Sequence, residues 1–508
     1  MEIKIILLVI FFGIMLAVGI YSRKHATNVN DFVLGGRSVG PWLTAFAYGT
    51  SYFSAVVFVG YAGQFGYKYG IASTWIGIGN ALIGSLLAWV ILGRRTRVMS
   101  NHLASTTMPD FFGKRYDSKA LRIAASGISF IFLIPYTASV YNGLSRLFGM
   151  AFDIPYEVCV IAMAALTGAY VIFGGYMATA INDFIQGIIM LVGIVAVIAS
   201  VLNGQGGFYE AVKELAEIES DLAPTMGQKG AFTSFFGPDI VNLLGVVVLT
   251  SLGTWGLPQM VHKFYAIKDE KSIKAGTIIS TVFAIIVSGG CYFLGGFGRL
   301  FDTEAIHNPD GSVIYDAIIP SMLSTLPDIL IGIVIMLVLS ASMSTLSSLV
   351  LTSSSTLTLD LIKGNIVKNM NEKKQLICMR IMLVFFIVIS VVIALDPPTF
   401  IAQLMGISWG ALAGAFLAPF MYGLYWKKVT KAAVWASFAS GVIITVANMF
   451  FKFIESPINA GALAMVAGLI IVPIVSLITP KMKKEKVDEI FSCLEETVVV
   501  HKSSSIEE

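Results

Sequence analysis

Charged residues are scarce in this sequence. Only 13% of the 508 residues are Asp, Glu, Lys or Arg, whereas 56% are hydrophobic. A water-soluble protein of this length could not bury so much apolar surface. The formal net charge of +3 is also too small to indicate a protein that binds nucleic acid. The composition therefore predicts a protein that is surrounded by lipid.

Cysteine is also rare, and several functional motifs are absent. The four cysteines show no CxxC spacing, which argues against a disulfide framework and against a thiolate metal site. The GxxxxGK[ST] string of nucleotide-binding loops does not occur, so a primary ATP-driven pump is not expected. The five histidines fall in predicted loops, in the C-terminal tail or at the ends of predicted helices. The sequence also offers no nucleophile–base pair, so we expect neither an enzyme nor an organic cofactor.

Long apolar runs are what the sequence has in abundance. A helix needs about 20 apolar residues to cross a bilayer, and about 13 stretches meet this requirement. The sequence thus predicts an all-α membrane protein with one transmembrane domain at 1–480 and a charged tail at 481–508, which we expect to be mobile. The stretches lie near 3–21, 41–64, 70–93, 121–149, 156–175, 177–202, 239–262, 275–300, 327–359, 380–395, 399–425, 431–451 and 460–479.

Basic residues gather in every second loop between these stretches. Arg23 and Lys24 follow the first stretch, and the basic loop after the seventh begins with Lys263. The intervening loops are acidic or nearly neutral, as at 210–221 and 302–316. Because basic loops remain in the cytoplasm, the pattern predicts a multi-pass cell-membrane protein. Its N-terminus would lie outside and its C-terminus in the cytoplasm.

The second stretch contains hydroxyls and a glycine at mid-membrane depth, at 47–54 (AYGTSYFS). Unwound backbone is tolerated at that depth only inside protein or along a cavity, where its freed carbonyls can coordinate a cation. The alternative is a regular helix whose Ser and Thr side chains bond to their own carbonyls. The seventh stretch is interrupted as well, at 253–259 (GTWGLPQ). If stretches two to six and seven to eleven form inverted halves, these interruptions correspond and indicate a transporter's central site.

Two further polar features lie inside predicted helices. Ten residues between 340 and 355 bear hydroxyls, of which most can be explained by close helix packing. A few of them could supply oxygen ligands to a small hard cation. Asp183 lies inside the sixth stretch, and a carboxylate within the membrane is by default a functional candidate. The alternative is that Asp183 lies near enough to the interface to stay hydrated.

Five short strings are typical of one family. Together they make the sequence resemble the sodium:solute symporter family, which includes bacterial sodium/proline, sodium/pantothenate and sialic acid symporters, over about residues 1–480. The resemblance implies a leucine-transporter-type five-plus-five inverted repeat at about 41–202 and 239–425, with one extra helix before it and two after. The strings are FVLGGRS at 32–38, FGGY at 173–176, ND at 182–183, SMST at 342–345 and GLYW at 423–426.

The resemblance also implies functional residues. Sodium, the coupling ion, would lie between the second and ninth stretches, and Asp183 would serve a second cation or ion release. The partners would be a small organic solute and sodium, with no obligatory protein partner. The implied sodium ligands are the carbonyls of Thr50, Phe53 and Ala341 and the hydroxyls of Ser344 and Thr345. The implied solute-binding residues are Tyr52, Ser54, Thr74, Tyr136, Thr254 and Pro258.

The identity of the solute is left open by the sequence. The proline branch of the family typically has an aspartate where this chain has Tyr52, and aromatic residues at Thr250 and Thr254. The pantothenate branch is more similar at Tyr52 and at 256–258, which favours a carboxylate-bearing, pantothenate-like solute. A sodium/proline symporter, a proton-coupled symporter that relies on Asp183, and a membrane sensor with a separate signalling partner are the alternatives. An intramembrane enzyme is the least favoured.

Overall fold

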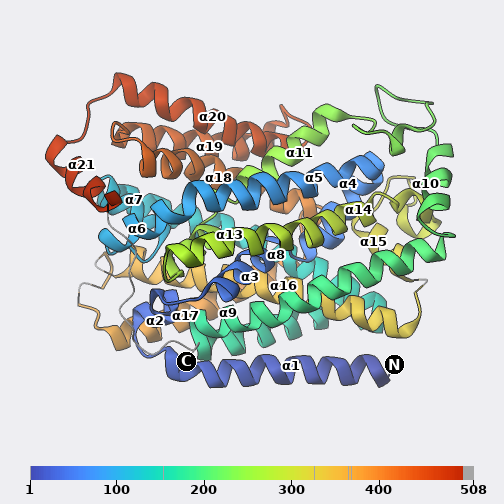
Figure 1. Cartoon of the computed structure of the whole chain (residues 1–508), viewed down its shortest axis with the longest axis horizontal. Helices are drawn as coiled ribbons and strands as arrows, with labels where there is room; N and C mark the ends of the chain where they lie inside the picture. Colours follow the sequence, from blue (N-terminus) through green and yellow to red (C-terminus); the bar gives the residue numbers. More distant parts are fainter. Residues whose placement is uncertain (1, 153, 325, 364, 368, 496–508) are drawn as a thin grey trace.

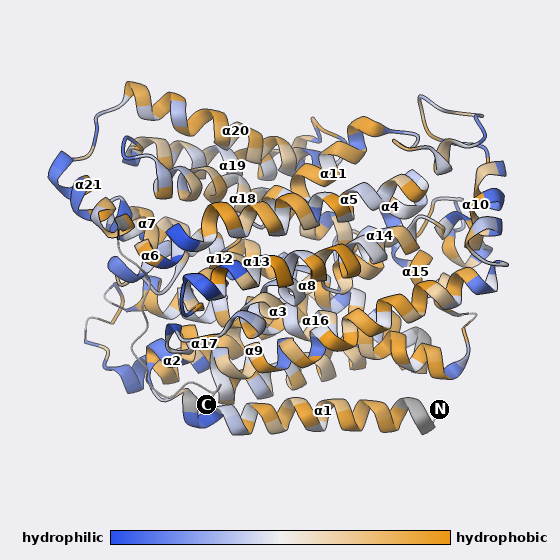
Figure 2. Ribbon diagram, viewed as in Figure 1, coloured by the Kyte–Doolittle hydropathy of each residue, from blue (hydrophilic) through white to orange (hydrophobic). Residues whose placement is uncertain are grey.

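The computed structural model describes residues 2–495, apart from residues 153, 325, 364 and 368. Within this part of the chain the long elements are all helices, and they run roughly side by side (Figure 1). Hydrophobic residues cover the lengths of the helices, and hydrophilic residues gather at the two ends of the bundle (Figure 2). Eleven helices among the described residues are long and apolar enough to cross a membrane. The all-α membrane fold is thus confirmed.

The difference between 11 helices and about 13 predicted crossings lies in two very long helices. Val56–His102 has 47 residues and Tyr156–Gly204 has 49, more than twice what one crossing needs. Each contains a glycine with positive φ, Gly70 at 61° and Gly175 at 56°. Left-handed backbone of this kind ends an α-helix. The chain therefore turns within both helices, while the number of crossings stays a prediction.

The most deeply buried helices form the centre of the bundle. α18 packs against α8, α19 and α20, and α16 packs against α3, α8, α9 and α17. α1 lies along one edge, against α9 (Figure 1). The long helices are α1 (Glu2–Ser22), α8 (Lys119–Phe152), α9 (Tyr156–Gly204), α13 (Glu270–Ala284), α16 (Asp328–Thr356), α17 (Glu372–Leu395), α18 (Ile401–Tyr425), α19 (Lys431–Phe451) and α20 (Pro457–Ile478).

Shorter helices lie at both ends of the bundle and within it. α6, α7 and α21 lie at the left end in Figure 1, and α10 and α15 lie at the right end. The short helices are α2 (Val29–Leu34), α3 (Pro41–Tyr52), α4 (Ala62–Tyr69), α5 (Thr74–Gly79), α6 (Arg94–His102), α7 (Met108–Arg115), α10 (Phe208–Glu217), α11 (Ile240–Gly253), α12 (Pro258–Ala266), α14 (Gly290–Gly295), α15 (Ile318–Ser324) and α21 (Lys484–Phe491).

Both predicted interruptions are breaks in the helical backbone. α3 ends at Tyr52, Phe53 is extended with φ −106° and ψ 100°, and a π-helical segment follows at Val56–Tyr61. α11 ends at Gly253, Leu257 is extended with φ −83° and ψ 122°, and Pro258 starts α12. Proline suits this first position because it has no N–H to leave unpaired. Both breaks are buried, so the freed polar groups face protein and not lipid.

The structure departs from the sequence-based expectations at two charged segments, 262–263 and 484–491. Lys263 and His262 do not begin a loop or end a span in water, because α12 continues to Ala266 and leaves their side chains only 2% and 5% exposed. The tail also contains regular structure, since α21 buries Val487, Ile490 and Phe491. Residues 496–508 lie outside the described part of the chain.

Candidate functional site

Oxygen atoms from α3 and α16 meet at the first helix break. The Ser344 hydroxyl donates to the Thr50 carbonyl at 3.0 Å, and the Thr345 hydroxyl lies 3.3 Å from the same carbonyl. Both hydroxyls lie 3.1 Å from the Ala341 carbonyl. All four residues are buried. Four of the five predicted sodium ligands therefore lie together.

The break in α3 explains why these carbonyls are free for such contacts. The last carbonyls of a helix have no partner within the helix, and Thr50 lies two residues before the end of α3. The C-terminal end of a helix also has partial negative charge. Carbonyl and hydroxyl oxygens at such an end provide a site that suits a hard cation.

The fifth predicted ligand lies differently. Among the described contacts, none joins the Phe53 carbonyl to this group of oxygens. The Phe53 ring stacks on Tyr52, with ring centroids 4.4 Å apart. The Ser51 carbonyl, which the sequence did not single out, instead lies 3.4 Å from the Thr345 hydroxyl.

An aromatic cluster lies directly beside the break. The Tyr52 hydroxyl donates to the Thr250 carbonyl of α11 at 2.5 Å, so it joins the two broken helices. The Tyr52 ring stacks on Trp409 of α18 at 6.0 Å, and the Tyr136 ring of α8 meets Trp409 edge-on at 5.7 Å. The Tyr136 hydroxyl faces Ser54 and Trp409. Tyr52, Ser54 and Tyr136 are therefore neighbours, as the resemblance implied.

Two polar atoms of this aromatic cluster face each other without a well-formed hydrogen bond. The Tyr136 hydroxyl and the Trp409 Nε1 are buried, and neither makes a hydrogen bond of good geometry with a described residue. Buried donors normally have a partner, because leaving one unpaired is costly. These two donors therefore make the aromatic cluster a candidate for binding a polar ligand.

The other predicted solute-binding residues are more scattered. Thr254 lies one turn after Thr250, but its hydroxyl donates to the Gly84 carbonyl at 3.0 Å. Pro258 lies on the far side of the second break, at the start of α12. Thr74 starts α5, and no described contact joins it to the aromatic cluster. The structure thus brings together only part of the predicted set.

Asp183 lies deep in the protein, which contradicts the hydrated-interface alternative. Its side chain is fully buried, and the Lys263 ammonium lies 3.8 Å from its Oδ2 atom. The same ammonium donates to the Ser348 hydroxyl at 2.9 Å. Ser348 in turn lies 2.7 Å from the Ser51 hydroxyl, oxygen to oxygen.

Comparison with known proteins identifies the family of this chain. The model of the family described as "Sodium:solute symporter family" matches residues 32–441. The chain belongs to the sodium:solute symporter family. It is therefore a membrane transporter and not an enzyme, and the resemblance inferred from the short strings is confirmed.

Relatives of this symporter match over nearly its whole length. The osmoregulated proline transporter OpuE of Bacillus subtilis is 29% identical over 497 residues, which cover 95% of this chain and 96% of OpuE. The sodium/proline symporter of Staphylococcus aureus is 29% identical over 503 residues, which cover 94% of this chain and 93% of the relative. Both relatives are named for proline, so a pantothenate-like solute is not supported.

The fold of the symporter is also that of known transporters. A Na⁺-coupled sialic acid symporter in a substrate-bound outward-open state has a TM-score of 0.77 at 17% identity, over 95% of this chain and 98% of its own. The nucleobase-cation-symport-1 family transporter Mhp1 has a TM-score of 0.51 at 12% identity, over 90% and 97% of the two chains. These similarities concern the fold alone.

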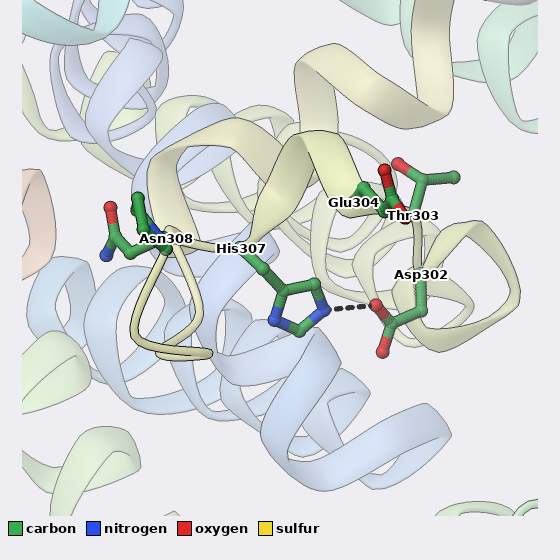
Figure 3. Close-up of a pocket in the computed structure, with 6 residues that line it drawn as sticks. Asp302, Thr303, Glu304, His307 and Asn308 are labelled. Carbon is green, nitrogen blue, oxygen red and sulfur yellow. Dashed lines mark hydrogen bonds and ion pairs between the residues drawn. The ribbon is translucent and has the colours of Figure 1, made fainter.

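His307 and Asp302 form a charged pair in the loop between α14 and α15 of the symporter, outside its candidate spans (Figure 3). His307 lies 2.6 Å from Asp302, which also accepts a hydrogen bond of 2.6 Å from Tyr67 of α4. The hydrogen bond with Asp302 raises the pKa of His307 above its ordinary value of 6.5. Burial acts to raise the pKa of Asp302, but the hydrogen bonds from Tyr67 and His307 outweigh it and hold this pKa below 3.8.

Proposed function

We propose that this protein imports a small organic solute together with sodium by alternating access. The observation that supports this most directly is the group of carbonyl and hydroxyl oxygens where the end of α3 meets α16. It lies beside an aromatic cluster that contains two unpaired donors. An ion site and a solute site that share one broken helix are what coupled transport requires.

Sodium would bind to the oxygens at the end of α3. We assign the carbonyls of Thr50 and Ala341 and the hydroxyls of Ser344 and Thr345 as ligands, with the Phe53 or the Ser51 carbonyl completing the set. Hydroxyls that now donate to carbonyls would turn their lone pairs toward the ion. The partial negative charge at the end of α3 would stabilise it further.

The solute would lie against Tyr52, Ser54, Tyr136 and Trp409. A carboxylate can accept from both the Tyr136 hydroxyl and the Trp409 Nε1, which satisfies the two buried donors. A small apolar ring would pack against the faces of Tyr52 and Trp409. Because the named relatives carry proline, proline is the first solute to test, even though Tyr52 departs from the proline branch.

Binding linkage would couple the two ligands. Sodium would order the end of α3, and the ordered end would present Tyr52 and Ser54 to the solute. Each ligand then raises the affinity for the other by the same factor. The membrane potential supplies about 2.3 kcal/mol per charge per 100 mV to drive sodium inward. Rocking of the two inverted halves would alternate access to the site.

The orientation in the cell membrane follows from the charge at the two ends of the bundle. α6 contributes Arg94 and Arg95 to the left end in Figure 1, whereas α10 contributes Glu210 to the right end. By the positive-inside rule, the left end would face the cytoplasm and the right end the outside.

A binding assay with purified protein tests this proposal. The melting temperature is measured with proline, pantothenate or sialic acid, in either NaCl or choline chloride of the same ionic strength. We expect proline to stabilise the protein in NaCl and to have little effect in choline chloride. Equal stabilisation in both salts would contradict sodium coupling. Stabilisation that follows pH instead of sodium would indicate a proton-coupled symporter of the same fold.

A further inference from the structure

Lys263 places a positive charge in the interior of the bundle. The side chain is 2% exposed and lies on α12, the second half of the second broken helix. A buried ammonium is costly unless charged and polar partners surround it. The groups that contact the Lys263 ammonium therefore indicate its role.

The partners of Lys263 come from two other helices. Asp183 on α9 lies 3.8 Å away, Ser348 on α16 accepts a hydrogen bond of 2.9 Å, and the Tyr176 ring centroid on α9 lies 5.3 Å away. Neither Asp183 oxygen has a hydrogen-bond partner among the described residues. The negative charge of the Asp183 carboxylate is thus compensated by an ion pair and not by hydrogen bonds, and Lys263 is the cation of that pair.

Two hydroxyls connect this lysine with the proposed sodium ligands. Ser348 contacts the Ser51 hydroxyl at 2.7 Å, and the Ser51 carbonyl lies 3.4 Å from the Thr345 hydroxyl. The ammonium therefore belongs to the same polar network as the end of α3. A change of charge at Lys263 would alter the electrostatic potential at the sodium site, because the residues between them are buried and charges in a protein interior are weakly screened.

We propose that Lys263 is a built-in cation. Its ammonium takes the place beside Asp183 and Ser348 that a second mobile cation would otherwise occupy, so the chain binds one sodium ion per cycle. This inference rests on the proposed sodium-coupled function. Without the ammonium, the Asp183 carboxylate and the hydroxyls of Ser348 and Ser51 form an oxygen-lined site with one negative charge, which suits a second sodium ion.

Sodium binding without any solute tests this inference. The melting temperature of the purified protein is titrated with NaCl against choline chloride at constant ionic strength. The variants are Lys263→Met, Asp183→Asn and the double variant, with Lys271→Met as the control because Lys271 is an exposed lysine on the next helix. Replacing both members of a buried ion pair is often tolerated, so the double variant supplies a comparison even if Lys263→Met does not fold.

The two single variants are expected to shift sodium affinity in opposite directions. The wild type and the control give a Hill coefficient of about one. Lys263→Met lowers the half-saturating sodium concentration and raises the Hill coefficient toward two. Asp183→Asn leaves the ammonium unbalanced and raises the half-saturating concentration roughly tenfold, a size expected for one unit charge at an effective dielectric of about 20. Adding Lys263→Met to Asp183→Asn restores nearly the wild-type value.

Several results would overturn the inference. If both single variants weaken sodium binding, or if the double variant binds no better than Asp183→Asn, Lys263 is only a structural residue. A wild-type Hill coefficient near two would also exclude a single sodium ion. These results leave sodium coupling itself intact, whereas a wild type that shows no response to sodium would refute the proposed function together with this inference.

Discussion

The Ser344 hydroxyl donates a hydrogen bond of 3.0 Å to the Thr50 carbonyl, across 294 positions of sequence. This contact joins the hydroxyl-rich helix α16 to the broken end of α3. It uses a carbonyl that the break has freed from its helical partner. An ion that binds here would therefore link two helices that must move relative to each other in a transport cycle.

The first prediction concerns the two hydroxyls of this contact. Replacing both Ser344 and Thr345 with alanine removes two side-chain ligands, each of which is worth about 1 kcal/mol. We expect the sodium concentration for half-maximal uptake to rise roughly tenfold or more. Ser354→Ala is the matched control, because Ser354 bonds only to the Leu351 carbonyl of its own helix among the described contacts. Unchanged sodium dependence in the double variant would exclude these ligands.

The second prediction concerns the unpaired donors of the aromatic cluster. Trp409→Phe and Tyr136→Phe keep an aromatic ring but remove a donor that we assign to the solute carboxylate. Each loss is worth about 1–1.5 kcal/mol, so the proline concentration for half-maximal uptake should rise about fivefold to tenfold. Sodium binding without solute should stay unchanged.

A matched control exists for the Trp409 variant. Trp89 is also fully buried with an unpaired Nε1, but it packs against Tyr48 and Phe264 and not against the aromatic cluster. Trp89→Phe should leave the proline concentration for half-maximal uptake near the wild-type value. Equal effects of the Trp89 and Trp409 variants would mean that the loss reflects packing and not solute binding.

The third prediction concerns pH and the loop cluster of His307 and Asp302. A raised histidine pKa means that the contribution of the pair to stability is complete below pH 6.5 and is lost as pH rises through the raised value. A lowered aspartate pKa means that the contribution is present above pH 3.8 and is lost as pH falls through the lowered value. The pair is thus strongest between these two pH values.

Thermal unfolding of His307→Gln across pH provides the measurement. The difference in melting temperature from the wild type should be largest near pH 5–6 and should shrink as the pH rises through the raised pKa of His307. His102→Gln is the control, because the described contact of this exposed histidine is the Glu489 carbonyl and not a carboxylate. A pH-independent difference for His307→Gln would contradict the ion-pair interpretation.

The fourth prediction concerns an ion-pair cluster at the end of the bundle near α7. Arg122 on α8 lies 2.9 Å from Asp360, which is fully buried, and 3.4 Å from Asp110 on α7. Arg122→Gln leaves a buried carboxylate without its cation, which is strongly destabilising. The melting temperature should fall, and adding Asp360→Asn should restore most of the loss. A double variant no more stable than Arg122→Gln would show that the arginine acts mainly by packing.

The sequence predicted the two helix breaks, and the meeting of α3 with α16, better than it predicted which residues line the site. Glycine and hydroxyls at mid-membrane depth predict unwinding at 47–54, and Pro258 predicts a restart, because both effects are local. Trp409 could not be recognised, since a tryptophan within an apolar helix resembles ordinary core. Its role depends on Tyr52 and Tyr136, which reach it only after folding.

Lys263 was misassigned for a related reason. It follows an apolar stretch and precedes other basic residues, so the local pattern indicates the start of a basic loop. The structure shows that α12 continues for three residues beyond it and that Asp183 lies against it. The sequence did contain an indication that Lys263 is buried, because the apolar residues Val261 and Phe264 flank His262 and Lys263, which is unusual for a hydrated loop.

The central claim is that sodium bound at the broken helix drives solute uptake. Purified protein in sealed liposomes, with labelled proline outside, tests it most directly, because the outer bath can contain either NaCl or choline chloride. The account predicts accumulation above the outside concentration in NaCl and none in choline chloride. The same accumulation in both baths would contradict it.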